Sequence, residues 1–468
     1  MTSSVSVAAA PVDKRFIGHP LGLMFLVLGE AFERFAFYGT NAILSLYLTK
    51  QLLLPGHAEH VVGVGVLKAL AAHGQSAASV VATATAVVGL YTMFCYITPL
   101  VGGWVADQWA GRSRTIAIGA ILMVAGYAMM AFEQSFVLAI LMILVGVGCF
   151  KGNIAAQIGD LYAPDDLRRS SGFQIFTLSI QCGAILAPIV CGGLAAAYGW
   201  KYGFFAAGAS MALGLAILTL GRPWLPAARA SGTKAAKPPP LTRRDWITIA
   251  ILIGMVPALS LSAVGNMQIF NTYLIWGDQH YNLVVGGKAM PASWLVSLDA
   301  IVSAGCLIAV LAFWRLWARF WREPGDLAKM IIGCLISATA PLLLAAASVQ
   351  EAATGQKIGL MWGVAFHVVN DIGFVNIYGV GMALFTRVAP KSLTAMMIAV
   401  YYFYLSFGGA LAGYLGGLLE PLGSVKFWLL HAGLCAAGAV MLLAFGLVFG
   451  GLLKPEAEPE AAAEPAMA

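Results

Sequence analysis

The sequence carries very little charge. Only 10% of its 468 residues are Asp, Glu, Lys or Arg, and 60% are hydrophobic, whereas soluble globular proteins have about 25% charged residues. A soluble chain of this length would need about two or three domains with polar surfaces, and this composition cannot cover such surfaces. The sequence therefore predicts an all-α integral membrane protein that is surrounded by lipid.

The sequence also lacks the motifs of several other protein classes. Its seven cysteines form no C-x-x-C pair, so we expect small buried side chains and neither a metal site nor a disulfide. It contains no H-E-x-x-H or G-x-S-x-G motif, and only His57 and His60 among the seven histidines lie close together in sequence. We therefore expect no enzyme, no cofactor and no nucleic-acid partner, with a membrane-embedded enzyme as the remote alternative.

Long apolar runs fill most of the chain instead. A transmembrane helix needs about 20 mainly apolar residues, and twelve segments meet this requirement. The first of them has no cleavage signal before it and is expected to be retained. The predicted spans are 20–50, 77–107, 113–133, 136–160, 170–198, 202–221, 244–279, 292–321, 327–349, 357–388, 391–419 and 424–453.

The spans fall into two sets of six. We predict an N-terminal tail (1–19), a six-helix bundle (20–222), a Pro-rich linker (223–243), a second bundle (244–453) and an acidic, disordered tail (454–468). Two six-helix halves around a central linker are typical of the major facilitator superfamily fold.

The basic residues are distributed unequally between the two sides of the membrane. Nineteen of the 27 lie in the termini and the even-numbered loops, and six lie in the odd-numbered loops. Because cytoplasmic loops collect Lys and Arg, both termini and the linker are expected to be cytoplasmic, in a bacterial inner (plasma) membrane.

Three charged residues lie inside the first apolar run. Glu30, Glu33 and Arg34 share one helical face, and Tyr38 extends that face by a turn. Two carboxylates beside one guanidinium cannot both be compensated, so one of them is expected to bind and release a proton. This pattern indicates proton coupling, and a structural ion cluster is the alternative.

Charges also lie in later spans, where they are costly and often functional. Lys151 is a candidate for a substrate carboxylate or a proton relay, or else a snorkelling lysine. Asp299 and Asp371 could carry a proton or meet a substrate amine, and Asp371 could instead cap a broken helix. Tyr91 is one of several tyrosines that could line a cavity.

A glycine-rich element joins the second and third spans. It includes Gly103, Asp107, Gly111 and Arg112. Glycines allow helices to approach closely, and Asp107 can cap the turn or pair with Arg112. We expect a gating and packing element that does not touch the substrate.

These residues resemble those of a known family. The run Glu30–Gly39 is similar to the E-x-x-E-R-F-x-Y-Y-G signature of the proton-dependent oligopeptide transporters (POT/PTR2), and Gly102–Thr115 resembles the loop signature of the major facilitator superfamily. FKGNIAAQIGDLY (Phe150–Tyr162), PASWLVSLD and LFTRVAPKSLTAMM resemble further segments of the same family. The resemblance covers nearly the whole chain.

The resemblance implies particular roles. Glu30, Glu33, Arg34 and Lys151 correspond to proton-coupling groups. Arg34 and Lys151 also correspond to residues that bind the peptide carboxylate, and Tyr38 and Tyr91 match tyrosines that line the family's cavity. The family implies a proton-coupled symporter of di- and tripeptides with small peptides, protons and lipid as its partners, and we expect it to act as a monomer.

The sequence departs from the family pattern mainly where the family binds the substrate amine. The affected positions are Phe37, Gly89, Thr177, Gln181, Met267, Asp299, Phe374 and Tyr401. We expect Asp371, helped by Gln181 and Gln268, to meet the amine, and Asp299 to be a second protonation site. A carrier of another amphoteric or anionic solute is the alternative.

Overall fold

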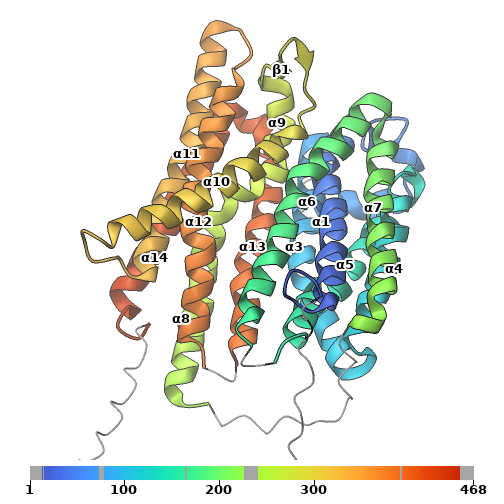
Figure 1. Cartoon of the computed structure of the whole chain (residues 1–468). Helices are drawn as coiled ribbons and strands as arrows, with labels where there is room; N and C mark the ends of the chain where they lie inside the picture. Colours follow the sequence, from blue (N-terminus) through green and yellow to red (C-terminus); the bar gives the residue numbers. More distant parts are fainter. Residues whose placement is uncertain are drawn as a thin grey trace, which may run out of the picture. The chain divides into compact units, whose positions relative to one another are not determined.

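The computed structural model describes residues 13, 15–72, 79–163, 166–225, 241–390 and 393–453, most of them in long helices (Figure 1). Most of the N-terminal tail, most of the 223–243 linker and the predicted 454–468 tail lie outside the described residues.

The long helices correspond to the predicted spans. They are α1 (Leu21–Tyr47), α3 (Val80–Val105), α4 (Arg112–Met129), α5 (Phe136–Asp160), α6 (Arg168–Tyr198), α7 (Trp200–Gly221), α8 (Arg243–Met267), α10 (Trp294–Trp317), α11 (Asp326–Thr354), α12 (Leu360–Val388), α13 (Thr394–Gly416) and α14 (Leu419–Phe449). Shorter elements are α2 (Val64–Ala72), α9 (Thr272–His280), the π-helical η1 (Leu48–Leu52) and η3 (Ala106–Ala110), and the 3-10 turns η2 (Ala58–His60), η4 (Glu133–Ser135), η5 (Arg222–Trp224) and η6 (Gln268–Phe270).

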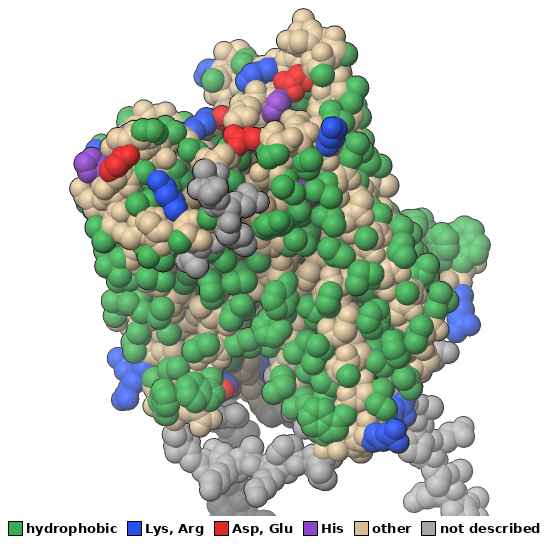
Figure 2. Space-filling view, turned by 180° about the vertical axis from the view of Figure 1, so that it is seen from behind, with side chains coloured by type: hydrophobic (Ala, Val, Ile, Leu, Met, Phe, Trp, Pro, Cys, Tyr) green, Lys and Arg blue, Asp and Glu red, His purple; other side chains and the backbone are tan. Residues whose placement is uncertain are grey.

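Ten segments of the described chain are long and apolar enough to cross a membrane. The helices α1 and α4 are not among the ten: α1 contains Glu30, Glu33 and Arg34, and α4 begins with two arginines. A helix satisfies its backbone hydrogen bonds internally, which lipid requires. On the face drawn in Figure 2, hydrophobic side chains cover the middle of the helices and most charged side chains lie near their ends.

The chain forms two compact units. Unit 1 contains 1–43, 59–62 and 98–232, and unit 2 contains 44–58, 63–97 and 233–468. In unit 1, α4 packs on α5 and α7, and α6 packs on α7. In unit 2, α11 packs on α12 and α14, α8 packs on α13 and α14, and α10 crosses α12 (Figure 1).

The predicted 244–279 span is not one continuous helix, which corrects that prediction. It breaks after η6 at Asn271, whose φ is −128° and ψ −111°, and continues as α9. The Gln268 side chain caps the break, because its Oε1 accepts from the Thr272 amide at 3.2 Å. The Asn271 side chain ties the break to α3, because its Nδ2 donates to the Thr85 carbonyl at 3.0 Å. Polar residues at the break therefore keep the backbone satisfied at membrane depth.

A small β-hairpin follows α9. Strand β1 (Val284–Val285) pairs antiparallel with β2 (Lys288–Ala289). Gly286 and Gly287 connect them with φ angles of 58° and 79°. Glycine adopts these positive angles readily, so this two-residue turn matches its sequence.

The cysteines only partly match the expectation of buried thiols. All seven are free, and five are buried, but Cys149 is half-buried and Cys182 is exposed. Cys182 lies on the face of α6 that carries Leu178 and Leu186, which are also exposed, so its thiol faces the surroundings of the protein.

Candidate functional site

The charges of α1 form a buried ion cluster in unit 1. Arg34 Nε lies 3.1 Å from Glu30 Oε1 and also pairs closely with Glu33 Oε2. The exposed fraction is 2% for Glu30, 0% for Glu33 and 3% for Arg34. The predicted sharing of one helical face is therefore confirmed.

The cluster is not fully satisfied. Within the described part of the chain, Glu30 Oε2, Glu33 Oε1 and Arg34 Nη2 are buried without a hydrogen-bond partner. Burial of a charged group is unfavourable unless it is paired and hydrogen-bonded. An unsatisfied carboxylate oxygen can take a proton, and an unsatisfied guanidinium N–H can meet an anion.

An aromatic ring lies beside both cations of this site. The Arg34 guanidinium carbon is 4.9 Å from the centroid of the Phe37 ring, and Lys151 Nζ is 5.7 Å from the same centroid. Lys151 also acts electrostatically on Glu30. The structure thus brings Lys151 of α5 to the α1 cluster.

Small residues let neighbouring helices approach α1 at the cluster. A Cβ on Gly183 of α6 would lie 2.8 Å from the Arg34 Cβ, and one on Gly214 of α7 would lie 3.2 Å from the Gly29 carbonyl oxygen. Ser210 of α7 donates to the Phe32 carbonyl at 2.7 Å. Close packing therefore requires small residues on α6 and α7 where these helices face the cluster. Tyr38 and Gln181, the other candidates in unit 1, are half-buried.

In the predicted gating element, α3, α4 and α5 pack closely together. Arg112 lies 3.5 Å from Asp107 and 2.5 Å from Asp160, so the expected Asp107–Arg112 pair is present and extends to α5. Gly111 links η3 to α4 with a φ of 74°. Gly103 is half-buried, whereas its neighbour Gly102 contacts the α5 backbone.

The candidates in unit 2 are distributed over several helices. Asp299 Oδ1 of α10 lies 2.8 Å from His367 Nδ1 of α12. Asp371 is 1% exposed and accepts a hydrogen bond of 3.3 Å from Asn370 Nδ2. Asp371 is thus a buried carboxylate within α12, away from the helix ends.

Gln268 is fully engaged in the fold of unit 2. Its Nε2 donates to the Ala412 carbonyl at 3.0 Å and lies 2.9 Å from His431 Nε2, while Oε1 accepts from Thr272. Gln268 is 0% exposed, so it reaches a solute only if α8 and α9 rearrange. Tyr91 is also buried, at 2% exposure.

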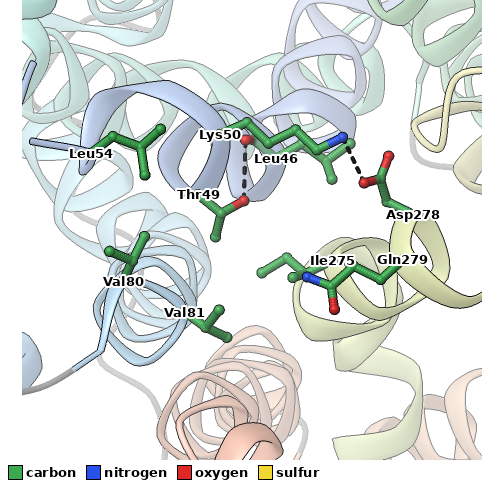
Figure 3. Close-up of a pocket in the computed structure, with 9 residues that line it drawn as sticks. All are labelled: Leu46, Thr49, Lys50, Leu54, Val80, Val81, Ile275, Asp278 and Gln279. Carbon is green, nitrogen blue, oxygen red and sulfur yellow. Dashed lines mark hydrogen bonds and ion pairs between the residues drawn. The ribbon is translucent and has the colours of Figure 1, made fainter.

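A small pocket in unit 2 surrounds an ion pair that sequence reasoning missed. Lys50 Nζ of η1 lies 2.6 Å from Asp278 Oδ2 of α9 (Figure 3). The cavity measures about 200 Å³ and is otherwise lined mainly by aliphatic residues such as Leu46 and Val80. Ligand pockets usually measure about 300–1,000 Å³, so we assign this cavity no substrate.

Three site features were not predicted: His367, the position of Phe37 and the Lys50–Asp278 pair. His367 precedes Asp371 by four residues and therefore shares its helical face, which is a signal that could have identified it. The sequence provides no signal for the Lys50–Asp278 pair, because these residues are far apart in the chain.

The long apolar helices and their arrangement define a multi-pass membrane protein with the major facilitator fold. A family model described as the POT family matches residues 113–237. The uncharacterized transporter YclF of Bacillus subtilis (strain 168) is 25% identical, with 96% of each chain covered. The peptide transporter YePEPT of Yersinia enterocolitica subsp. palearctica serotype O:3 (strain YE-P4) is 24% identical, with 87% of this chain and 89% of that protein covered.

Solved structures share the fold. A peptide transporter POT in complex with sulfate matches with a TM-score of 0.80 at 22% identity, covering 94% of this chain and 97% of that one. A POT family transporter in complex with 5-aminolevulinic acid matches with a TM-score of 0.74 at 21% identity, covering 95% and 99%. The chain is thus similar in sequence to the POT family model over residues 113–237 and shares the fold of solved POT family transporters.

Proposed function

We propose that this protein is a proton-coupled symporter that imports di- and tripeptides by alternating access. The observation that carries the proposal is the buried Glu30–Glu33–Arg34 cluster, with Lys151 close to it. Intramembrane charges are rare and usually mark a transport pathway. The proton is the coupling ion, and no cofactor is needed.

The charges of the cluster suggest how proton and substrate are linked. Arg34 cannot lose its proton in a protein, so Glu30 and Glu33 are the groups that can change charge. We assign them proton binding. Arg34, whose Nη2 atom lacks a hydrogen-bond partner among the described residues, and Lys151 are assigned the substrate carboxylate.

The substrate amine is assigned to a carboxylate. Asp371 is the candidate, because its Oδ2 atom is buried without a hydrogen-bond partner in the described part of the chain. Tyr38, Tyr91, Gln181 and Gln268 are proposed to help position the peptide. Asp299 is proposed as a second protonation site.

The remaining assignments concern the protein as a whole. Gly103, Asp107, Gly111 and Arg112 are proposed to hold the helices that move during gating. We place the carrier in the bacterial inner membrane as a functional monomer with both termini in the cytoplasm, because basic residues are concentrated on that side.

A carrier of another amphoteric or anionic solute is the second candidate. One related structure is a complex with 5-aminolevulinic acid, which carries an amine and a carboxylate as a peptide does. This chain also departs from the family pattern mainly at positions linked to the amine. Competition of peptides, amino acids and organic acids against one labelled dipeptide separates the two candidates.

Uptake of a labelled dipeptide into liposomes tests the proposal. We expect an inward proton gradient to drive accumulation by the wild-type protein, and we expect Glu33→Gln and Lys151→Ala to lose it. Counterflow at equal pH on both sides serves as the control for folding of Glu33→Gln, and a monodisperse elution profile in detergent serves for Lys151→Ala, because Lys151 is also assigned to the substrate. Full gradient-driven uptake by both variants would exclude the assigned coupling site.

A further inference from the structure

Four polar side chains form a continuous chain in unit 2. Asp299 Oδ1 is 2.8 Å from His367 Nδ1, His367 Nε2 is 3.0 Å from the Tyr273 hydroxyl, and that hydroxyl is 3.4 Å from the Tyr281 hydroxyl. This row of hydrogen-bonded side chains runs from α10 through α12 to α9. All these distances allow hydrogen bonds.

This row of hydrogen-bonded side chains reaches the surface of the structure at one end only. The Asp299 side chain is 13% exposed, whereas that of His367 is 0% exposed, and Tyr273 and Tyr281 are also fully buried. The Tyr273 ring packs in an edge-to-face arrangement against the His367 ring, with centroids 5.2 Å apart. A proton from water can therefore enter this group at Asp299.

The hydrogen bonds can accommodate one additional proton. With a neutral ring protonated at Nδ1, His367 donates to Asp299 and accepts from Tyr273. An added proton either stays on the Asp299 carboxyl group or charges the ring. A charged ring donates from both nitrogens, so the Tyr273 hydroxyl must then donate to Tyr281. In either case the net charge of the Asp299–His367 pair rises from −1 to 0.

A second carboxylate lies nearby. Asp371 follows His367 by one helical turn, and Asp299 acts electrostatically on it. Within the described residues, no Lys or Arg forms an ion pair with either carboxylate. The other groups facing the pair are Tyr273 and Tyr281 near α9 and the Cys306 thiol of α10.

Among the described residues, α11 and α14 form no ion pair with these groups. The α14 helix presents Trp428, whose ring lies 6.5 Å from that of Tyr273, and α11 presents the Ser337 hydroxyl to the Asn370 carbonyl. His367 is therefore the basic side chain of this group among the described residues.

We propose that Asp299 and His367 together form a second proton-binding unit of the carrier, with His367 as the base and Tyr273 fixing its orientation. This inference rests on the proton-coupled transport proposed above. Two carboxylates in apolar surroundings repel each other when both are charged. The group loses its net negative charge only when one proton occupies the pair and one substrate ammonium occupies Asp371. A neutral group is the state that changes its exposure across the membrane at the lowest desolvation cost, so the carrier reorients with both bound.

A static role for His367 makes a different prediction. A permanently neutral His367 would only hold α10, α12 and α9 together, and transport would keep its pH dependence without it. His367→Gln keeps a polar side chain of similar reach but cannot take up a proton. Asp299→Asn keeps the shape of the carboxylate and removes its charge.

The experiment compares these variants with the wild type in liposomes. Accumulation of a labelled dipeptide is measured at a pH difference of one unit, and counterflow is measured without a gradient. We expect both variants to retain counterflow and to accumulate about tenfold less, because each coupled proton adds about a factor of ten per pH unit. We also expect both to flatten the pH profile of uptake.

The chain offers a matched control. His280 Nδ1 lies 2.6 Å from Glu351 Oε2, which makes a second histidine–carboxylate pair in unit 2 with about a quarter of each side chain exposed. His280→Gln should accumulate peptide like the wild type. His367→Gln with wild-type accumulation and pH profile would overturn the inference.

Three further outcomes are decisive. If both variants lost counterflow as well, the test would use Tyr273→Phe, which keeps the ring and removes the hydroxyl. A shifted pH profile of uptake by this variant supports the inference, and an unchanged profile refutes it. A wild-type protein without proton-driven uptake would refute the proposed function itself. A coupled wild type with unchanged variants would refute only the role of this pair.

Discussion

At the scale of single residues, Phe37 lies beside both Arg34 and Lys151, the two cations of the α1 site. Its ring lies below both the Arg34 guanidinium and the Lys151 ammonium group. A cation over an aromatic face is stabilised by about 0.5–1 kcal/mol at exposed sites and about 2 kcal/mol when desolvated. The ring therefore positions two groups that we assign to the substrate carboxylate.

Replacing Phe37 tests this role. Phe37→Leu removes the aromatic face and should weaken apparent dipeptide affinity about fivefold, which corresponds to about 1 kcal/mol. Phe37→Tyr keeps the face and should stay within about twofold of the wild type. The measurement is the concentration dependence of uptake. Equal affinities for Phe37→Leu and the wild type would show that the ring does not position the cations.

The distance along the chain decided which site residues could be predicted. Glu30, Glu33 and Arg34 are separated by three and four residues, so helical geometry alone places them together. The Asp299–His367 bond joins residues 68 positions apart, and only the packing of α10 on α12 creates it. The position of Phe37 between two cations likewise depends on how α5 meets α1.

At the scale of the elements, two adjacent glycines of α3 have different environments. A Cβ on Gly102 would lie 2.0 Å from the Gly148 carbonyl oxygen of α5, whereas one on Gly103 would meet nothing within 4 Å. Asn153 of α5 also donates to the Gly102 carbonyl at 3.2 Å. Of these two adjacent positions of α3, only Gly102 must therefore be a glycine for the contact with α5.

Single alanine substitutions test this difference. Gly102→Ala should destabilise the protein by about 1–3 kcal/mol, because the α5 backbone cannot yield without moving the helix. Gly103→Ala should be neutral or slightly stabilising, because alanine is the better helix former. Apparent melting temperatures in one detergent give the comparison. Equal shifts for the two variants would contradict the assigned contact.

The Lys50–Asp278 pair connects η1 to α9 within unit 2. Lys50→Asp and Asp278→Lys each place like charges together and should lower the apparent melting temperature, and the double exchange should restore it. The coupling should be about 0.5–1 kcal/mol, because the pair is partly exposed. A double variant that is no more stable than the two single variants would show that the pair does not hold these elements together.

Most helices could be predicted from the sequence, because runs of apolar residues long enough to cross lipid have few alternatives. The break at Asn271 could not be predicted, because the side chains that fix it bond to distant parts of the chain: Gln268 donates to the Ala412 carbonyl of α13, and Asn271 donates to the Thr85 carbonyl of α3. The residues before and after Gln268 and Asn271 in the sequence are mainly apolar, so the segment has the composition of a continuous span.

At the scale of the whole molecule, the distribution of basic residues predicts how the chain crosses the membrane. Lys288 in the β-hairpin should be outside, and Arg322 between α10 and α11 should be inside; both are exposed. With an impermeant maleimide, Lys288→Cys should react in intact cells and Arg322→Cys only after permeabilisation. The wild-type protein measures the background from exposed Cys182. The reverse labelling pattern would invert the proposed orientation.

The account as a whole depends on protons moving together with the substrate. The most direct measurement is the internal pH of liposomes that contain the protein and a trapped pH-sensitive dye, after a dipeptide is added outside at equal pH. We predict acidification of the interior by the wild-type protein and none by Glu33→Gln, whose buried carboxylate next to Arg34 is replaced by a neutral amide. Entry of labelled dipeptide without acidification by the wild-type protein would contradict the account.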